Sequence, residues 1–300
     1  MIELFEDFCV YLKTKKKMSE NTLSSYRRDI KNFIIFLQSI NVYAIDKVDA
    51  QIISQYISYL KKHKKSCATI SRNLSSLRCF FKYLIMKKVI TFNPTTGIKN
   101  EKSTSSLPEI MSSQDVDTLL SSPDTTTVLG MRDKAMLELL YATGIRVSEL
   151  LNITVFDINL DVGYVNVKNS STKERIVPLY PMAVEALRCY LNLSRDKLVD
   201  GKSGSDILFL NSTGSQMTRQ GFWKIIKQYA RLTKINADIT PKILRHSFAT
   251  HLLENGADIN VIKDMLGHTA ISSTKVYTKV IKNKYMNVYA NCHPRAKHMQ

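Results

Sequence analysis

The feature that most limits the fold of this chain is a break in its patterning at residues 93–110. The stretch NPTTGIKNEKSTSSLPEI collects Pro, Gly, Ser, Thr and charged residues and lacks an apolar period, as exposed linkers do. The full length of 300 residues also suits two domains better than one. We therefore predict an N-terminal domain over residues 1–92, a linker over 93–108 and a second domain over 109–300.

The N-terminal part has the pattern of helices throughout. Apolar residues recur at spacings of three and four, with hardly any glycine. The clearest segment is SENTLSSYRRDIKNFIIFLQ, in which Ser19 is the expected N-cap. This pattern predicts a four-helix bundle with one basic surface. The apolar stripe of the clearest helix consists of Leu23, Tyr26, Ile30, Phe33, Ile34 and Leu37.

The C-terminal part mixes helices with one hairpin. The stretch VGYVNVKNSSTKERIVPL, residues 162–179, alternates with period two on both sides of NSST, which predicts two antiparallel strands. The fold class is therefore mainly α in two domains, and the second domain is α+β with a small antiparallel sheet. Helices are predicted over 132–144, 181–198, 218–234, 241–255, 258–266 and from about 281, with Gly144, Gly256 and Gly267 as stops.

The charge of the chain favours a polyanionic partner. The formal charge is +17, of which residues 1–100 carry +11, and the pI is about 9.6. A run such as KTKKK, taken alone, would fit a solvated face. An excess of positive charge over the whole chain instead indicates nucleic acid as the partner. An anionic membrane surface is the competing partner, and we do not favour it because the basic segments carry an apolar periodicity that requires a core.

Several function classes have no support in the sequence. The five cysteines are widely spaced and form no CxxC pair, so we expect reduced thiols in the cytoplasm. Acidic residues interrupt the N-terminal MIELFEDFCVYLK, which does not fit a signal peptide. No metal-ligand spacing and no phosphate-binding glycine motif occurs, so we expect neither a metal nor a cofactor.

Three short stretches place cations beside helix ends. Arg146 follows the glycine break in ATGIRVSELL, and His268 precedes Tyr277 by nine residues in MLGHTAISSTKVYTK. In TPKILRHSFATHLLENG, Lys242 and Arg245 fall at i and i+3 on one face of a first helical turn. Helix N-termini attract anions, so this turn predicts a site of phosphate size.

These motifs resemble a known family. ATGIRVSELL, KERIVPL, LRHSFATHLLENGAD, MLGHTAISSTKVYT and HPRA look, in order and spacing, like the catalytic-domain motifs of the tyrosine site-specific recombinases of the Xer type. The segment SENTLSSYRRDIKNFIIFL is similar to the first helices of that family's SAM-like core-binding domain. The resemblance covers nearly the whole chain, and five motifs in order make chance a poor explanation.

The resemblance implies a reaction and assigns residues to it. Tyr277 would attack a DNA phosphodiester to give a 3′-phosphotyrosine without ATP or metal. Arg146 and Arg245 match the family arginines that contact the nonbridging oxygens, and His268 matches the histidine beside the phosphate. Lys242 stands where the family usually has histidine.

The general acid of the hairpin is the position where the chain departs from the family. Counted back from KERIVPL, the usual lysine position holds Ser170. Lys168 lies two residues earlier and would share a strand face with it, so we assign the role to Lys168, with Lys173 as the alternative.

The resemblance also implies partners. We expect double-stranded DNA, a homo-tetramer or a hetero-tetramer with a sister recombinase, and a DNA translocase as a further candidate. The role would be chromosome dimer resolution, and thus cell division, or integration and excision of a mobile element. The segment VIKNKYMNVYANC after Tyr277 is the expected docking element between protomers.

Two rival functions and several plainer readings stay open. One rival is a DNA-binding accessory protein of the same fold with impaired catalysis, suggested by the hairpin lysine. The other is relaxation of supercoiled DNA in the manner of type IB topoisomerases. Among single residues, we expect Glu149 to orient Arg146, and His246 and His251 to belong to a core or helix face. We expect Trp223 to lie in the core, and the alternative is that its amphipathic helix lies along DNA.

Overall fold

The computed structural model describes residues 1–99, 109–169, 172–199, 206–235 and 238–268. The chain divides into two compact units, Met1–Ser106 and Leu107–Gln300. Each unit has a hydrophobic core of its own. In the described part of the chain no helix is both long and apolar enough to span a lipid bilayer.

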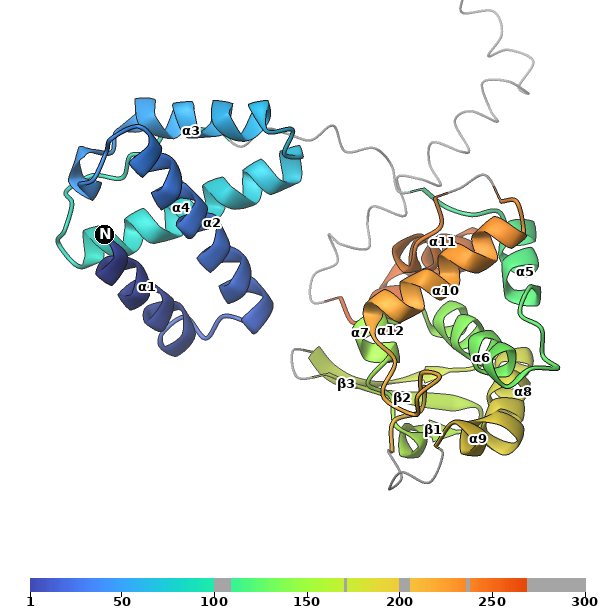
Figure 1. Cartoon of the computed structure of the whole chain (residues 1–300). Helices are drawn as coiled ribbons and strands as arrows, with labels where there is room; N and C mark the ends of the chain where they lie inside the picture. Colours follow the sequence, from blue (N-terminus) through green and yellow to red (C-terminus); the bar gives the residue numbers. More distant parts are fainter. Residues whose placement is uncertain (100–108, 170–171, 200–205, 236–237, 269–300) are drawn as a thin grey trace, which may run out of the picture. The chain divides into compact units, whose positions relative to one another are not determined.

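The first unit is the predicted bundle of four helices (Figure 1). Ser19 caps the second helix by accepting a hydrogen bond from the backbone N–H of Thr22 at 3.4 Å, as predicted. The predicted apolar stripe points inward, and Ile30 and Phe33 are fully buried. The helices are α1 (Ile2–Thr14), α2 (Glu20–Ser39), α3 (Ala50–Lys62) and α4 (Cys67–Met86), with a 3₁₀ turn at Ile45–Lys47.

The first residues of the predicted linker pack against the first unit. Thr95 is buried, and Ile98 lies against the core. The guanidinium of Arg78 on α4 donates a hydrogen bond to the carbonyl of Ile98. This short segment therefore extends the N-terminal unit.

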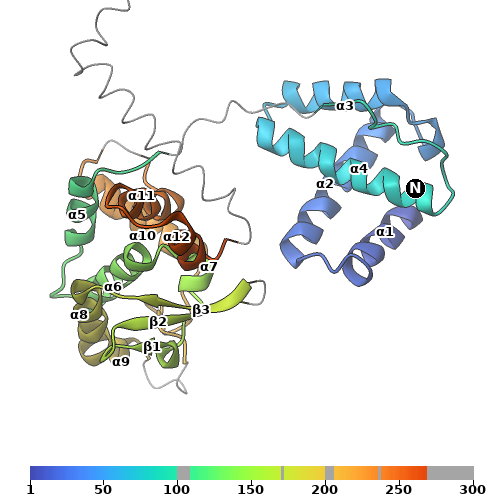
Figure 2. The same ribbon diagram turned by 180° about the vertical axis from the view of Figure 1, so that it is seen from behind.

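The second unit surrounds one central helix, α6 (Val128–Thr143). In both Figure 1 and Figure 2, α6 lies between a three-stranded sheet on one side and α10 and α11 on the other, and α12 packs against α11 and β3. The other helices are α5 (Ser113–Ser121), α7 (Val147–Leu150), α8 (Pro181–Cys189), α9 (Asp196–Val199), α10 (Arg219–Leu232), α11 (Pro241–Glu254) and α12 (Ile259–Leu266). A 3₁₀ turn at Val155–Asp157 precedes the sheet, and a π-helical stretch at Tyr190–Arg195 joins α8 to α9, where one helix over 181–198 was predicted.

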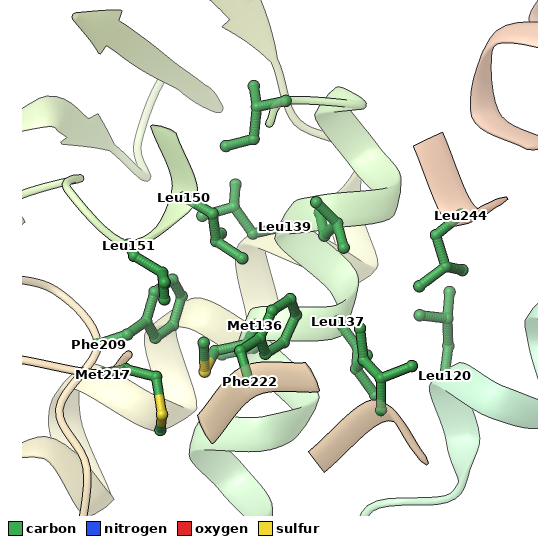
Figure 3. Packing of buried hydrophobic residues seen from close by; sticks show 14 of the residues in the cluster. Leu120, Met136, Leu137, Leu139, Leu150, Leu151, Phe209, Met217, Phe222 and Leu244 are labelled. Carbon is green, nitrogen blue, oxygen red and sulfur yellow. The ribbon is translucent and has the colours of Figure 1, made fainter. Parts of the chain in front are cut away.

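The central helix is buried over most of its surface, as a helix inside a core must be. Met136, Leu137 and Leu139 point from α6 toward different neighbours in Figure 3, and all three are fully buried. The charges on this helix are paired, as burial requires. Arg132 Nη2 lies 2.7 Å from Asp133 Oδ1, and the Tyr229 hydroxyl donates to Asp133 Oδ2 at 3.0 Å.

The sheet contains the predicted hairpin and one extra strand. Strands β1 (Ile158–Asn159), β2 (Tyr164–Asn169) and β3 (Thr172–Pro178) are antiparallel and lie in that order. Val165 pairs with Val177, and Val167 pairs with Arg175. The three valines are buried, so Arg175 points from β3 toward the core side of the sheet. The register shifts between Val167 and Asn169.

The prediction that Trp223 belongs to the core is wrong. Its side chain on α10 is 47% exposed, and Lys227 Nζ lies 5.3 Å from the ring centroid. Phe222 and Ile226 take the buried face of this helix instead.

Candidate active site

Arg146 is held at the junction between α6 and α7. Gly144 ends α6 in the left-handed conformation, with φ of 57°, and Arg146 then caps α7. The backbone N–H of Arg146 donates to Glu149 Oε2 at 2.8 Å, and its Nη1 donates to Oε1 at 3.0 Å. The Glu149 side chain is 1% exposed, whereas that of Arg146 is 38% exposed. The predicted orienting role of Glu149 is confirmed, and Arg146 retains an edge that is open to solvent.

Arg245 comes from the first turns of α11. Thr240 caps this helix by accepting from the N–H of Ile243 at 3.2 Å, and Pro241 occupies the first position, as predicted. Arg245 is buried, and its Nη1 donates to the carbonyl of Gly144 at 2.6 Å. Lys242 lies one turn earlier and is exposed.

Three arginines meet at the C-terminal end of α12. The last carbonyls of a helix lack partners within it and carry the negative end of the helix dipole, so cations are favoured there. Gly267 ends α12 in the left-handed conformation, with φ of 63°. Three consecutive carbonyls each accept from a different arginine: Met265 from Arg175 Nε at 2.7 Å, Leu266 from Arg245 Nη2 at 2.8 Å and Gly267 from Arg146 Nη2 at 3.1 Å.

His268 follows these carbonyls and joins the cluster. Its Nε2 lies 3.0 Å from Arg245 Nη2. A guanidinium can only donate, so Nε2 accepts and the proton of the neutral ring is on Nδ1. Burial, and then the charges of Arg245, Arg146 and Arg175, lower the pKa of His268 to about 4. The imidazole is therefore neutral at neutral pH.

The site as a whole is cationic. His246 is also held neutral, because burial and then Lys242 and Arg245 lower its pKa to about 4. The guanidiniums and Lys242 thus carry the positive charge, and Glu149 is the carboxylate that pairs with Arg146 and Arg175. Fixed donors of this kind bind a phosphate and stabilise charge that develops on it.

Lys168 lies on β2 and pairs with a carboxylate. Its Nζ donates to Asp157 Oδ1 at 2.6 Å, and 61% of its side chain is exposed. The hydrogen bond with Asp157, then the charge of that carboxylate, raises the pKa of Lys168. The role of Lys168 as the general acid stays a prediction. Ser170, Tyr277, the helix from about 281 and the HPRA motif lie outside the described residues, as does the side chain of Lys173.

Sequence reasoning assigned no role to Arg175. Its side chain is 10% exposed, and Nη2 and Nη1 donate to the two oxygens of Glu149 at 2.9 and 3.3 Å. A signal was present in KERIVPL, because period-two alternation places Arg175 on the same strand face as buried Val177. A cation on an apolar face needs a partner, and the partner is Glu149.

His251 has the structural role that was expected. The Tyr141 hydroxyl lies 2.8 Å from Nδ1, and Nε2 lies 3.0 Å from the carbonyl of Met111. A carbonyl can only accept, so Nε2 donates to Met111 and Nδ1 accepts from Tyr141. Ser247 Oγ accepts from the N–H of Met111 at 2.8 Å. One face of α11 thus carries the arginine site, and other positions of the same helix anchor the start of the second unit.

The fold and the site together define a class of protein. A helical unit precedes a domain whose arginines and neutral histidine form an anion site, and a tyrosine follows nine residues after that histidine. Such a protein holds a phosphodiester for attack by a side-chain hydroxyl.

Comparison with known proteins identifies the family. Residues 5–88 match the Phage integrase, N-terminal SAM-like domain, and residues 109–284 match the Phage integrase family. The chain therefore belongs to the phage integrase family.

Relatives along the full length support this assignment. The Tyrosine recombinase XerD of Oceanobacillus iheyensis is 45% identical over 292 residues, which cover 97% of this chain and 98% of the relative. The protein of the same name from Staphylococcus haemolyticus is 42% identical over 296 residues, which cover 99% of this chain and 100% of that relative. The solved XerH site-specific recombinase bound to palindromic difH substrate, a post-cleavage complex, has the same fold, with a TM-score of 0.76 at 19% identity over 96% of this chain and 94% of that one.

Proposed function

We propose that this chain is a site-specific DNA recombinase that cuts and rejoins strands through Tyr277. The observation that carries the proposal is the convergence of Arg146, Arg245 and Arg175 beside the neutral His268. Relatives that are tyrosine recombinases over nearly the same length support it. This function needs cations that bind the phosphate ahead of a tyrosine, and the converging arginines support that role.

The reaction exchanges one phosphoester bond for another. The phenolic oxygen of Tyr277 attacks phosphorus, the bond to the tyrosine forms, and the bond to the 5′ oxygen breaks. Arg146 and Arg245 stabilise the negative charge on the nonbridging oxygens, and the Nδ1–H of His268 is available as a further donor. The phenol loses its proton and the leaving 5′ oxygen gains one. The second attack, by a 5′ hydroxyl, reverses these steps and releases the tyrosine.

Two lysines complete the proposed site. Lys242 occupies the exposed first turn of α11, where a cation can contact the backbone of DNA. Lys168 donates the proton to the leaving oxygen once its Nζ has exchanged Asp157 for substrate. No metal or nucleotide takes part in this scheme.

A nicked oligonucleotide duplex tests the function. When the nick lies near the cut, the short released strand diffuses away and the covalent adduct accumulates. We expect an adduct in EDTA with the natural chain, and none with Tyr277→Phe, which should still bind the duplex. DNA binding without an adduct under any condition would instead support the accessory protein. Relaxation of plasmids without regard to sequence would support the topoisomerase-like activity.

The assembly that we propose is a tetramer on two DNA sites, made of this chain alone or with a sister recombinase. An apolar hollow of about 410 Å³ in the second unit supports a docking contact between protomers. Its lining includes Tyr141, Phe248 and Leu252. We propose that residues 281–300 of one protomer enter this hollow of the next.

We place the activity in the cytoplasm, with a DNA translocase as a further partner, in chromosome dimer resolution or mobile-element transfer.

A further inference from the structure

Of Arg146 and Arg175, which both pair with Glu149, Arg175 is the more deeply buried. Its side chain is 10% exposed, against 38% for Arg146, although both pair with the same carboxylate. Arg175 contacts both oxygens of Glu149 through Nη1 and Nη2, while its Nε donates to the carbonyl of Met265. The guanidinium thus ties β3 to the end of α12 and to the turn that holds Arg146.

The charge balance explains why a second arginine is needed. Glu149 is buried, and a buried carboxylate without enough partners draws any nearby cation onto itself. If Glu149 faced Arg146 alone, both oxygens could take the fork of Arg146 in a bidentate pair. Because Arg175 already contacts both oxygens, Arg146 gives Glu149 a single Nη and keeps an open edge.

The packing of Arg175 also bears on His268. A Cβ added to Gly267 would stand 2.9 Å from Cζ and from Nη1 of Arg175, so the guanidinium lies directly against this turn. Arg175 holds Met265, and His268 follows three residues later. A displaced Arg175 would therefore release the turn that presents His268.

We propose that Arg175 is a positioning residue of the strand-cleavage reaction. It neutralises Glu149 so that Arg146 stays free for the phosphate, and it fixes the turn that carries His268. The inference rests on the proposed function, because it assigns the phosphate to Arg146. Arg175 itself is enclosed by protein groups and does not touch the substrate.

The first experiment measures single-turnover formation of the covalent adduct on the nicked duplex. We expect Arg175→Gln to slow this step on the order of 100-fold, as misplaced groups do, while duplex binding in a gel shift changes little. Arg175→Lys keeps the positive charge but loses the forked guanidinium. Its rate of adduct formation should fall between those of Arg175→Gln and the natural chain. Arg188→Gln is the matched control: Arg188 lies on α8, its side chain is 46% exposed, and the variant should act like the natural chain.

The double variant Glu149→Gln with Arg175→Gln separates positioning from mere support of the fold. A neutral amide no longer draws Arg146, so we expect the double variant to form adduct at least about 10-fold faster than Arg175→Gln alone. A purely structural role predicts that removing both partners is no better than removing one. The inference is overturned by a double variant as slow as the single one, or by Arg175→Gln with the natural rate.

A second measurement keeps this inference distinct from the proposed function. If the natural chain forms no adduct, the proposed function fails. The Nε–H resonance of Arg146 in ¹⁵N NMR still reports on its position. We expect it to move in Arg175→Gln, to return toward its natural place in the double variant, and to stay in place in Arg188→Gln. If the Arg146 resonance stays in place in Arg175→Gln, the inference is refuted, whether or not the natural chain forms an adduct.

Discussion

At the scale of single residues, His268 depends on its surroundings for its protonation state. Its Nε2 accepts a hydrogen bond from Arg245, which a protonated ring could not do. Its pKa falls to about 4, and so does that of His246. Both rings are therefore neutral beside Arg245, and the positive charge of the site comes from the arginines and Lys242.

This arrangement predicts a pH dependence. An unfolded histidine takes up a proton as the pH falls through about 6.5, whereas His268 and His246 do so only near pH 4. The unfolded state then binds more protons, so stability is complete above about pH 6.5 and decreases as the pH falls toward 4. NMR titration of the ring carbons, with His268→Gln for assignment, should give a midpoint near 4. A midpoint near 6.5 in the DNA-free protein contradicts the proposed cluster, and bound DNA should raise the value.

The general acid can be found by changing the leaving group. We expect Lys168→Ala to slow cleavage of a normal duplex by about 100-fold or more, because an alkoxide leaves poorly without a proton. A duplex with sulfur at the bridging 5′ position should restore the rate, since a thiolate leaves without protonation. Lys173→Ala is the matched variant. The lysine whose loss is rescued by sulfur is the acid, and rescue of Lys173→Ala alone would overturn the choice of Lys168.

At the scale of elements, the end of α6 positions the site. Gly144 turns the chain into the left-handed region and offers its carbonyl to Arg245. A Cβ at this position would stand 2.3 Å from Cδ1 of Phe248 on α11. The stop of α6 and its packing on α11 therefore both require glycine here.

Two glycines allow the conformational and packing costs to be separated. Gly144→Ala should lower the free energy of unfolding by about 1–2 kcal/mol for the left-handed backbone, and by about 1–3 kcal/mol more for the clash. Gly256 has φ of +88°, and an added Cβ there would meet no atom within 4 Å, so Gly256→Ala should show the backbone cost alone. Urea denaturation of both variants measures the difference. Equal losses would show that the contact with Phe248 relaxes freely.

The α11 helix illustrates how one element serves two tasks. Arg245 reaches the end of α12, whereas Ser247 and His251 hold Met111 at the start of the second unit. The apolar spacing of α11 is irregular because polar groups occupy buried positions on it. Arg245, Ser247 and His251 each have a hydrogen-bond partner, as burial requires.

At the scale of the whole molecule, assembly is the property that the C-terminal segment should control. We expect deletion of residues 281–300 to weaken the protein tetramer on two DNA sites while a single bound protomer still forms adduct. Leu252→Glu, which places a charge in the lining of the apolar hollow, should weaken the tetramer in the same way. Native gels and sedimentation of the DNA complexes measure both. Unchanged tetramers in either variant would contradict the docking proposal.

Local signals were sufficient for much of the fold. Features that depend on a few neighbouring residues could be predicted. They are the helix caps at Ser19 and Thr240, the helix stops at Gly144 and Gly267, and the alternation in the hairpin. Trp223 was mispredicted because the amphipathic pattern of α10 leaves the choice of buried face to neighbouring elements. The site's cations were predicted from their motifs, but Arg175 was not.

By itself, the sequence determined the two helical units, the helix ends and the cationic motifs that precede Tyr277. Only the tertiary structure decided which arginine meets which carbonyl, because those bonds join residues 101 and 121 positions apart, as in Arg245 with Gly144 and Arg146 with Gly267. Short patterns describe one turn or one strand, whereas these contacts depend on the packing of α6, α11, α12 and the sheet around a shared core.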